Sequence, residues 1–122
     1  MAKGDDIQER LVGLAADIVI FCKELPKGPT GTHLANQLIR SGTSPAPNYA
    51  EARGAESDRD FVHKLRVVLK ELNETEVWLQ ILVRAGIASK DAIEPLRQEC
   101  IALARIMSAS IRTMKERGVT AG

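Results

Sequence analysis

The sequence has few aromatic residues, few cysteines and no long apolar run. Only 3% of its 122 residues are aromatic, so its core must be aliphatic. Its two cysteines, Cys22 and Cys100, lack the close spacing of a zinc site or a disulfide scaffold, and we expect buried, reduced thiols. No stretch approaches the roughly 20 apolar residues that span a bilayer, and the amino terminus is polar rather than signal-like. These absences predict a cytoplasmic protein.

A surplus of either charge is also missing. Seventeen Lys and Arg residues oppose sixteen Asp and Glu residues, and the net charge of +1 gives no global field toward nucleic acid or an anionic membrane. There is no glycine-rich phosphate loop, nucleophile elbow or pair of cysteine ligands. Only Asp60 and His63 approach the Glu-x-x-His spacing of a di-iron bundle. We therefore expect no metal, no cofactor and no enzymatic activity.

What the sequence does have is apolar residues at alternating steps of three and four. One such series is Ile7, Leu11, Leu14, Ile18, Phe21 and Leu25. This spacing puts each series on one stripe of a helix, and the expected helices span about residues 5–24, 31–53, 58–86 and 89–117 of a single domain, 1–122. Short connections favour antiparallel neighbours, so we expect an all-α, up-down-up-down four-helix bundle.

The second expected helix is interrupted by Pro45 and Pro47. Each proline removes a backbone donor, which favours a break, but the apolar series continues through them, which favours a kinked, continuous helix. We favour the kink. This helix should begin near Thr30 to Thr32 with a threonine cap, and Ser57 or Asp58 and Ser89 should cap the two helices that follow.

Apolar residues also lie away from the core stripes of the last two helices. The core of a single bundle does not cover this second apolar face, which predicts contacts between copies of the chain. The alternative is scattered exposed aliphatic residues, which are normal on any surface. The candidate oligomer interface is Val67, Val77, Trp78, Ile81, Ile101 and Ile106.

Polar residues occupy or border inward positions of the second and third helices. Their burial requires partners, and we expect a bridge from Arg40 to Glu76 or Glu51 in a network that fixes helix register. A ligand or catalytic pocket is the alternative. The candidate network is Gln37, Arg40, Ser41, Asn48, Glu51, Glu74 and Glu76.

Basic residues follow one arc of the last expected helix. Repeated around an oligomer, they could combine into a phosphate-binding surface, but Glu94 and Glu116 share the arc, which favours a plain solvated face. The candidate phosphate contacts are Arg97, Arg105, Arg112 and Lys115.

Several polar positions form a recognisable motif. Gln37-x-x-Arg40-Ser41-x-x-Ser44 is followed by Asn48-x-x-Glu51, and Glu74-Thr75 precedes Trp78-Leu79. From Leu11 to Lys115 the chain resembles the four-helix-bundle family of 23S ribosomal RNA intervening-sequence proteins. That family is similar in fold to the pentameric accessory protein of diversity-generating retroelements, so the resemblance implies a ring-shaped homo-oligomer, a pentamer. Gly42 and Ala52 stand where relatives commonly have Ala and Gly.

Together these patterns predict a non-enzymatic homo-oligomer that binds a macromolecular partner, and RNA or another nucleic acid is one candidate for that partner. The alternative is a protein-interaction scaffold that does not bind nucleic acid. No membrane association is expected.

Overall fold

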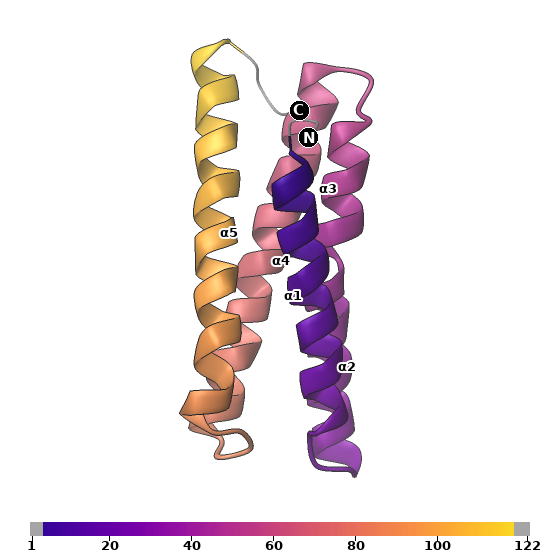
Figure 1. Ribbon diagram of the computed structural model, residues 1–122, viewed down its shortest axis with the longest axis vertical. Coiled ribbons are helices and arrows are strands. Elements are labelled where there is room, and N and C mark those ends of the chain that lie inside the picture. The colour runs from indigo at the N-terminus through magenta and orange to yellow at the C-terminus, as the bar shows by residue number, and fades with distance from the viewer. Residues whose placement is uncertain (1–3, 119–122) are drawn as a thin grey trace.

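The computed structural model describes residues 4–118, and within them the chain forms five helical segments and no strand (Figure 1). These are α1 (Asp5–Lys23), α2 (Pro29–Thr43), α3 (Pro45–Arg53), α4 (Asp58–Arg84) and α5 (Lys90–Glu116). The expected boundaries agree to within one or two residues at each end, where helix ends commonly fray. The expected domain also includes residues 1–3 and 119–122, which lie outside the described residues.

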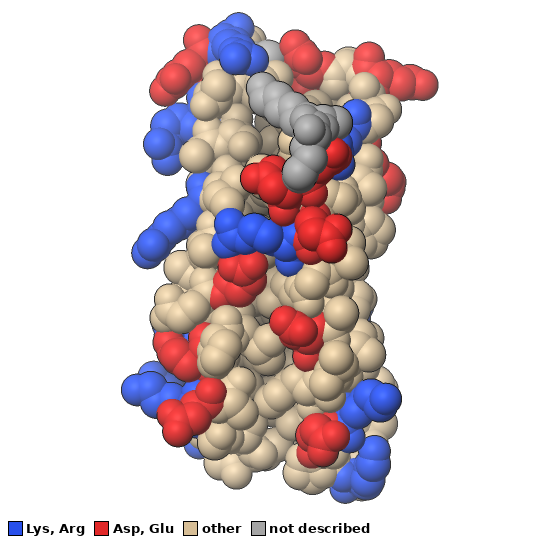
Figure 2. Space-filling view, in the orientation of Figure 1, with Lys and Arg blue, Asp and Glu red and all other residues tan. Residues whose placement is uncertain are grey.

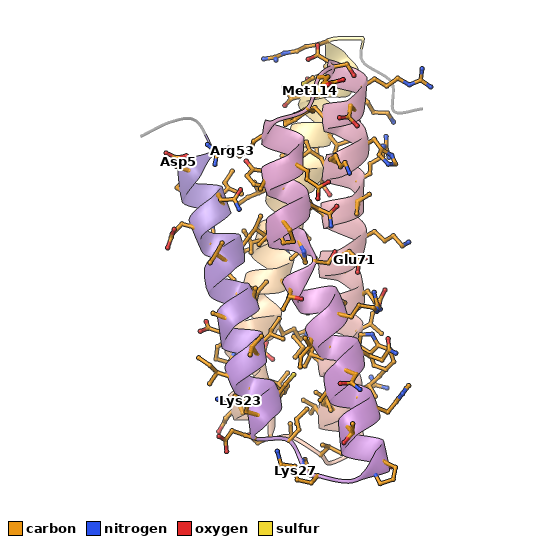
Figure 3. The ribbon with its side chains drawn as sticks, turned by 90° about the vertical axis from the view of Figure 1, so that its right-hand side faces the viewer. Asp5, Lys23, Lys27, Arg53, Glu71 and Met114 are labelled. Carbon is orange, nitrogen blue, oxygen red and sulfur yellow. The ribbon has the colours of Figure 1, made fainter. Side chains whose placement is uncertain are left out.

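The helices form the predicted antiparallel four-helix bundle, in which α2 and α3 together make one of the four rods (Figures 1 and 3). Within residues 4–118, α1 packs against α2, α3 and α5 but not against α4. Helices α1 and α4 are therefore diagonal neighbours, and they run in the same direction because each is separated from the other by one antiparallel rod.

The core is aliphatic, as the composition predicts. Leu11, Ile18, Leu38, Leu65 and Leu103 are at most 1% exposed, and residues at the expected heptad positions pack around them. Cys22 and Cys100 are buried free thiols, which confirms that prediction. Burial raises the pKa of Cys22 to about 11 and that of Cys100 to about 12. Among the described residues, no helix combines the length and apolar character needed to cross a membrane.

The kink in the second rod lies at Ser44, between α2 and α3. Ser44 keeps helical dihedral angles, φ −70° and ψ −38°, so the chain bends without leaving the helical region. The prolines bend the rod because each lacks the N–H that would continue the hydrogen-bond ladder. The kinked helix is confirmed.

The start of α2 differs from the prediction. The helix begins at Pro29, after Gly28, and has no side-chain cap, so the expected threonine cap is wrong. Proline suits the first helical position because its N–H would have no partner there. The other two caps are confirmed: Ser57 Oγ accepts from the N–H of Asp60 at 3.0 Å, and Ser89 Oγ accepts from that of Ala92 at 3.1 Å.

Candidate functional site

Arg40, near the end of α2, forms an ion-pair cluster with two carboxylates of α4. Its guanidinium lies 3.4 Å from Glu71 Oε2 and also pairs with the carboxylate of Glu74, while Gln37 Oε1 accepts at 3.4 Å. The Arg40 side chain is 50% exposed. The cluster therefore ties α2 to α4 at the surface, and the expectation that Arg40 is buried is wrong.

Two aromatic rings extend this cluster. The indole N–H of Trp78 donates to Glu74 Oε2 at 3.0 Å, and the His33 ring meets the Trp78 ring edge-on, with centroids 6.4 Å apart. Trp78 is half-buried and packs against the core. Because its indole already has partners within the subunit, Trp78 is a weaker interface anchor than its sequence position indicates.

The expected bridge from Arg40 to Glu76 or Glu51 is wrong. Glu51 is exposed and pairs with Lys64 at 3.1 Å, whereas Glu76 lies 3.7 Å from Arg97 of α5. A long guanidinium side chain reaches carboxylates on more than one neighbouring turn, so helix faces alone do not identify its partner.

The buried polar contact of the core is the pair Ser41 and Thr75. Both are 0% exposed, and their hydroxyl oxygens lie 2.9 Å apart between α2 and α4. Thr75 Oγ1 also lies 2.8 Å from the carbonyl oxygen of Glu71. Thr75 belongs to the sequence motif and Ser41 to the expected polar network, and together they fix the register of the two helices.

Asn48 acts at the kink, as its place in the network indicates. Its side-chain Nδ2 donates to the carbonyl oxygen and to the hydroxyl of Ser44, each at 2.9 Å. The expected network is thus five separate groups: a surface cluster at Arg40, a buried hydroxyl pair, a local clamp at the bend, and the ion pairs of Glu51 with Lys64 and of Glu76 with Arg97.

The four candidate phosphate contacts on α5 divide into two kinds. Arg97 pairs with Glu94 at 3.2 Å and with Glu76, and Gln98 donates to Glu94, which lowers the pKa of Glu94. Arg97 is therefore neutralised within the subunit. The other three are exposed and form no salt bridge within residues 4–118: Arg105, Arg112 and Lys115.

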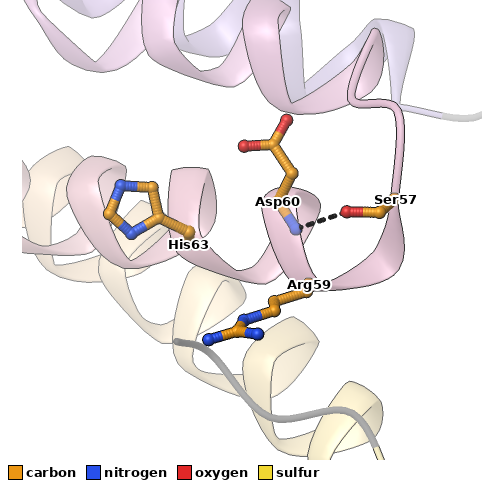
Figure 4. Close-up of a pocket in the computed structure, with 4 residues that line it drawn as sticks. All are labelled: Ser57, Arg59, Asp60 and His63. Carbon is orange, nitrogen blue, oxygen red and sulfur yellow. Dashed lines mark hydrogen bonds between the residues drawn. The ribbon is translucent and has the colours of Figure 1, made fainter.

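A second set of basic residues, missed by sequence analysis, lies on the outward face of α4. Arg59, His63, Arg66 and Lys70 are exposed and form no salt bridge within the described residues. Figure 4 shows the start of this face, where Arg59 and His63 line a shallow depression with Ser57 and Asp60. These residues are spaced by four, three and four positions, which puts them on one helical arc, and this spacing is the signal that could have identified the set.

Exposed apolar side chains gather on two helices. Of the predicted interface residues, Val77 and Ile81 are 52% and 39% exposed, whereas the others, Val67, Trp78, Ile101 and Ile106, are half-buried. Sequence analysis missed three exposed residues on α1. These are Val12 at 47%, Val19 at 39% and Ile20 at 61%.

Within residues 4–118, no group of three or more His, Cys, Asp or Glu side chains could hold a metal ion. The pair Asp60 and His63 lacks a third ligand among these residues, and both thiols are buried and free. The described surface therefore offers charged and apolar faces rather than a metal centre.

The fold and these surfaces define a class of protein, an antiparallel four-helix bundle whose outer helix faces are left uncovered. The sequence profile of the family described as "23S rRNA-intervening sequence protein" matches residues 5–109, and the chain belongs to this family. Among solved structures it is similar to a protein of unknown function from the S23 ribosomal protein family of Bacteroides thetaiotaomicron. That similarity has a TM-score of 0.79 and 30% sequence identity and covers 86% of this chain and 97% of the other. None of the curated proteins matches.

Proposed function

We propose that the protein is a non-enzymatic, cytoplasmic homo-oligomer that binds RNA through the C-terminal half of α5. The observation that carries this proposal is the set of unpaired basic side chains on that helix. In residues 103–117, Glu116 is the sole acid beside Arg105, Arg112, Lys115 and Arg117. A chain with a net charge of only +1 thus concentrates positive charge on one helix end, in a family described by its relation to 23S rRNA.

Oligomerisation is the second part of the proposal. Within residues 4–118 every exposed large apolar side chain lies on α1 or α4, and α1 and α4 do not contact each other. Such faces are typical of surfaces that a partner covers. A ring repeats the α5 patch once per subunit, which raises affinity for an extended polyanion. Five subunits is the number that the resemblance to the retroelement accessory protein implies.

A gel-shift titration with a fluorescent, structured RNA hairpin tests the RNA part. We expect the combined variant Arg105→Gln, Arg112→Gln and Lys115→Gln to weaken binding by about tenfold or more and to reduce the slope of log K against log salt by about three. The matched control, Lys27→Gln with Lys90→Gln, removes exposed charges at the opposite end of the bundle. Equal binding by the α5 variant and the wild type would contradict the proposal.

The near-zero net charge favours one other candidate, a scaffold that gathers another protein on the ring. An intact oligomer that shows no salt-dependent RNA binding, but retains a specific protein partner in affinity purification from its native cell, would support the scaffold.

A further inference from the structure

The exposed faces of α1 and α4 have the same pattern with opposite charge. Each carries an apolar centre, Ile20 with Val12 and Val19 on α1, and Val77 with Ile81 on α4. Because the two helices are diagonal in the bundle, one copy of the chain cannot bring these centres together.

Charged residues flank each apolar centre. On α1 the exposed acids are Asp6, Glu9 and Asp17, and Glu24 follows as its C-cap residue. On α4 the exposed bases on the same arc are Arg66, Lys70 and Arg84. None of these seven takes part in a salt bridge within the described residues, whereas the α1 base Arg10 is held by Glu99 at 2.6 Å, which leaves Lys23 as the unpaired base of α1. Figure 2, which views the molecule from the side of α1, shows acidic side chains at several heights, with basic side chains beside some of them and uncharged surface between.

The relative heights of the two helices follow from their contacts with the rod between them. On α1, Gln8 Nε2 donates to the carbonyl oxygen of Ala46 at 3.2 Å, and Cys22 Sγ donates to that of Ala35 at 3.8 Å. These bonds place Gln8 level with Ala46 of α3 and Cys22 level with Ala35 of α2.

Two contacts give the level of α4 against the same rod, α2 and α3. Thr75 is level with Ser41, and Lys64 is level with Glu51. Ala46 stands midway between Ser41 and Glu51 in the sequence, so its level on α4 is midway between the two contacts, at about residue 70. Gln8 contacts Ala46, so Gln8 and the next residue, Glu9, are level with Lys70.

The contact between Cys22 and Ala35 gives the level of the C-terminal end of α1. Ala35 lies six residues before Ser41 on α2, and α2 and α4 are antiparallel. The residue of α4 at the level of Ala35 is therefore six residues past Thr75, which is Ile81. Cys22, which contacts Ala35, is therefore level with Ile81.

The geometry points to a specific interface between copies: the outward face of α1 of one copy packs in parallel against the outward face of α4 of the next. This inference rests on the proposed homo-oligomer and names the surfaces that form it. Without any shift along the bundle axis, Ile20 meets Ile81 near the ends of the two helices, and Glu9 meets Lys70 further along them. The same levels place Glu24, with Lys23 beside it, near Arg84.

The interface is heterologous, because it joins two different faces. A rotation with no axial shift closes such a contact into a ring, whereas a shift would produce a filament. Helix α5 is not part of the contact, so its unpaired basic residues stay uncovered. An isologous alternative, α1 on α1 or α4 on α4, would place charges of the same sign together and is disfavoured.

Cross-linking tests the pairing directly. We expect the double variant Ile20→Cys/Ile81→Cys, treated with a short bismaleimide, to give a ladder of covalent multimers, while each single variant gives only the uncrosslinked chain. The matched control, Ile20→Cys/Gln98→Cys, places the second thiol on the outward face of α5 and should give no ladder. Wild type measures the background from Cys22 and Cys100, which are buried. Dimers from either single variant would show an isologous contact and overturn the inference.

A charge swap keeps the inference testable where cross-linking geometry is unfavourable. Glu9→Lys and Lys70→Glu should each shift the oligomer toward monomer, by about tenfold or more in dissociation constant, and the double variant Glu9→Lys/Lys70→Glu should restore assembly. Two singles that assemble normally, or a double variant weaker than both, would overturn the pairing. A wild-type oligomer together with either result leaves the proposed function standing, whereas a monomeric wild type removes the proposed oligomer itself.

Discussion

Ser41 and Thr75 bring two hydroxyl groups together inside a core that is otherwise aliphatic. Each satisfies part of the other's hydrogen-bonding capacity where no water reaches, because both side chains are fully buried. The pair lies between α2 and α4, so it also penalises any slip of one helix against the other.

Replacing Thr75 by valine keeps the shape of the side chain and removes the hydroxyl. We expect the free energy of unfolding to fall by about 1–2 kcal/mol, because the buried Ser41 hydroxyl loses its close partner. Thr113→Val is the matched control, since Thr113 makes a similar bond to the carbonyl of Ala109 on an exposed face, and its effect should stay within about 0.5 kcal/mol. Urea unfolding followed by circular dichroism measures both, and equal effects would argue against the register role.

The two buried thiols predict a pH dependence of stability. The pKa of a cysteine, ordinarily 9.0, is raised to about 11 at Cys22 and to about 12 at Cys100 in the folded chain. Between pH 9 and 12 the folded state therefore keeps protons that the unfolded state has lost, so stability falls as pH rises through this window.

We expect wild type to lose about 1 kcal/mol or more of stability between pH 8 and pH 10.5 beyond what Cys22→Ala/Cys100→Ala loses. The other titrating groups are the same in both proteins, so their contribution to the pH-dependent change in stability cancels. Any cavity left by alanine lowers stability equally at both pH values and cancels as well. Urea unfolding at the two pH values provides the measurement, and identical losses would show that the thiols do not contribute.

Residue partners were the least predictable part of the site. The expected network correctly included Glu74 with Arg40, but it missed Glu71, the second partner of Arg40, and Glu76 pairs instead with Arg97 of α5. Helical periodicity gives the direction of a Cβ, whereas the final turn of a long side chain depends on the neighbouring helix.

At the scale of elements, the loop before α2 depends on a close approach of backbone to backbone. A Cβ at Gly31 would overlap the carbonyl oxygen of Pro26, which cannot move aside as a flexible side chain could. Glycine is therefore required here by packing, in a helix that otherwise has ordinary geometry.

Gly31→Ala should reduce the free energy of unfolding by about 1–3 kcal/mol through this overlap. The matched control is Gly54→Ala at the end of α3, where the nearest atoms to an added Cβ are 3.9 Å away and no clash results. Thermal unfolding distinguishes them. Retention of the wild-type melting temperature by Gly31→Ala would mean that the turn before α2 can adjust.

Element existence and order could be predicted because the three-and-four apolar spacing persists over each helix, and the serine caps mark the starts of α4 and α5. The start of α2 could not, because Pro29 initiates it without a capping side chain. The exposed apolar residues of α1 were also missed. Val12, Val19 and Ile20 interleave with its core stripe, so the helix looks uniformly apolar and its outward face is distinguished only once neighbours cover the other side.

At the scale of the whole molecule, one bundle leaves two complementary faces and one basic helix end uncovered. The α1 and α4 faces match in height, apolar content and charge, which accounts for their exposure if copies of the chain cover them. The basic half of α5 then projects from every subunit and supplies the RNA-binding surface of the proposal. The sequence pointed to the α4 face and to α5, but the match between α1 and α4 required the level of each helix.

The mass of the wild-type protein in solution tests this account most directly. Size-exclusion chromatography with light scattering at micromolar concentration should give one species of about five times the 13.3 kDa subunit mass, unchanged over a tenfold dilution, because a closed ring has no free interface. A single species of 13.3 kDa would contradict the account.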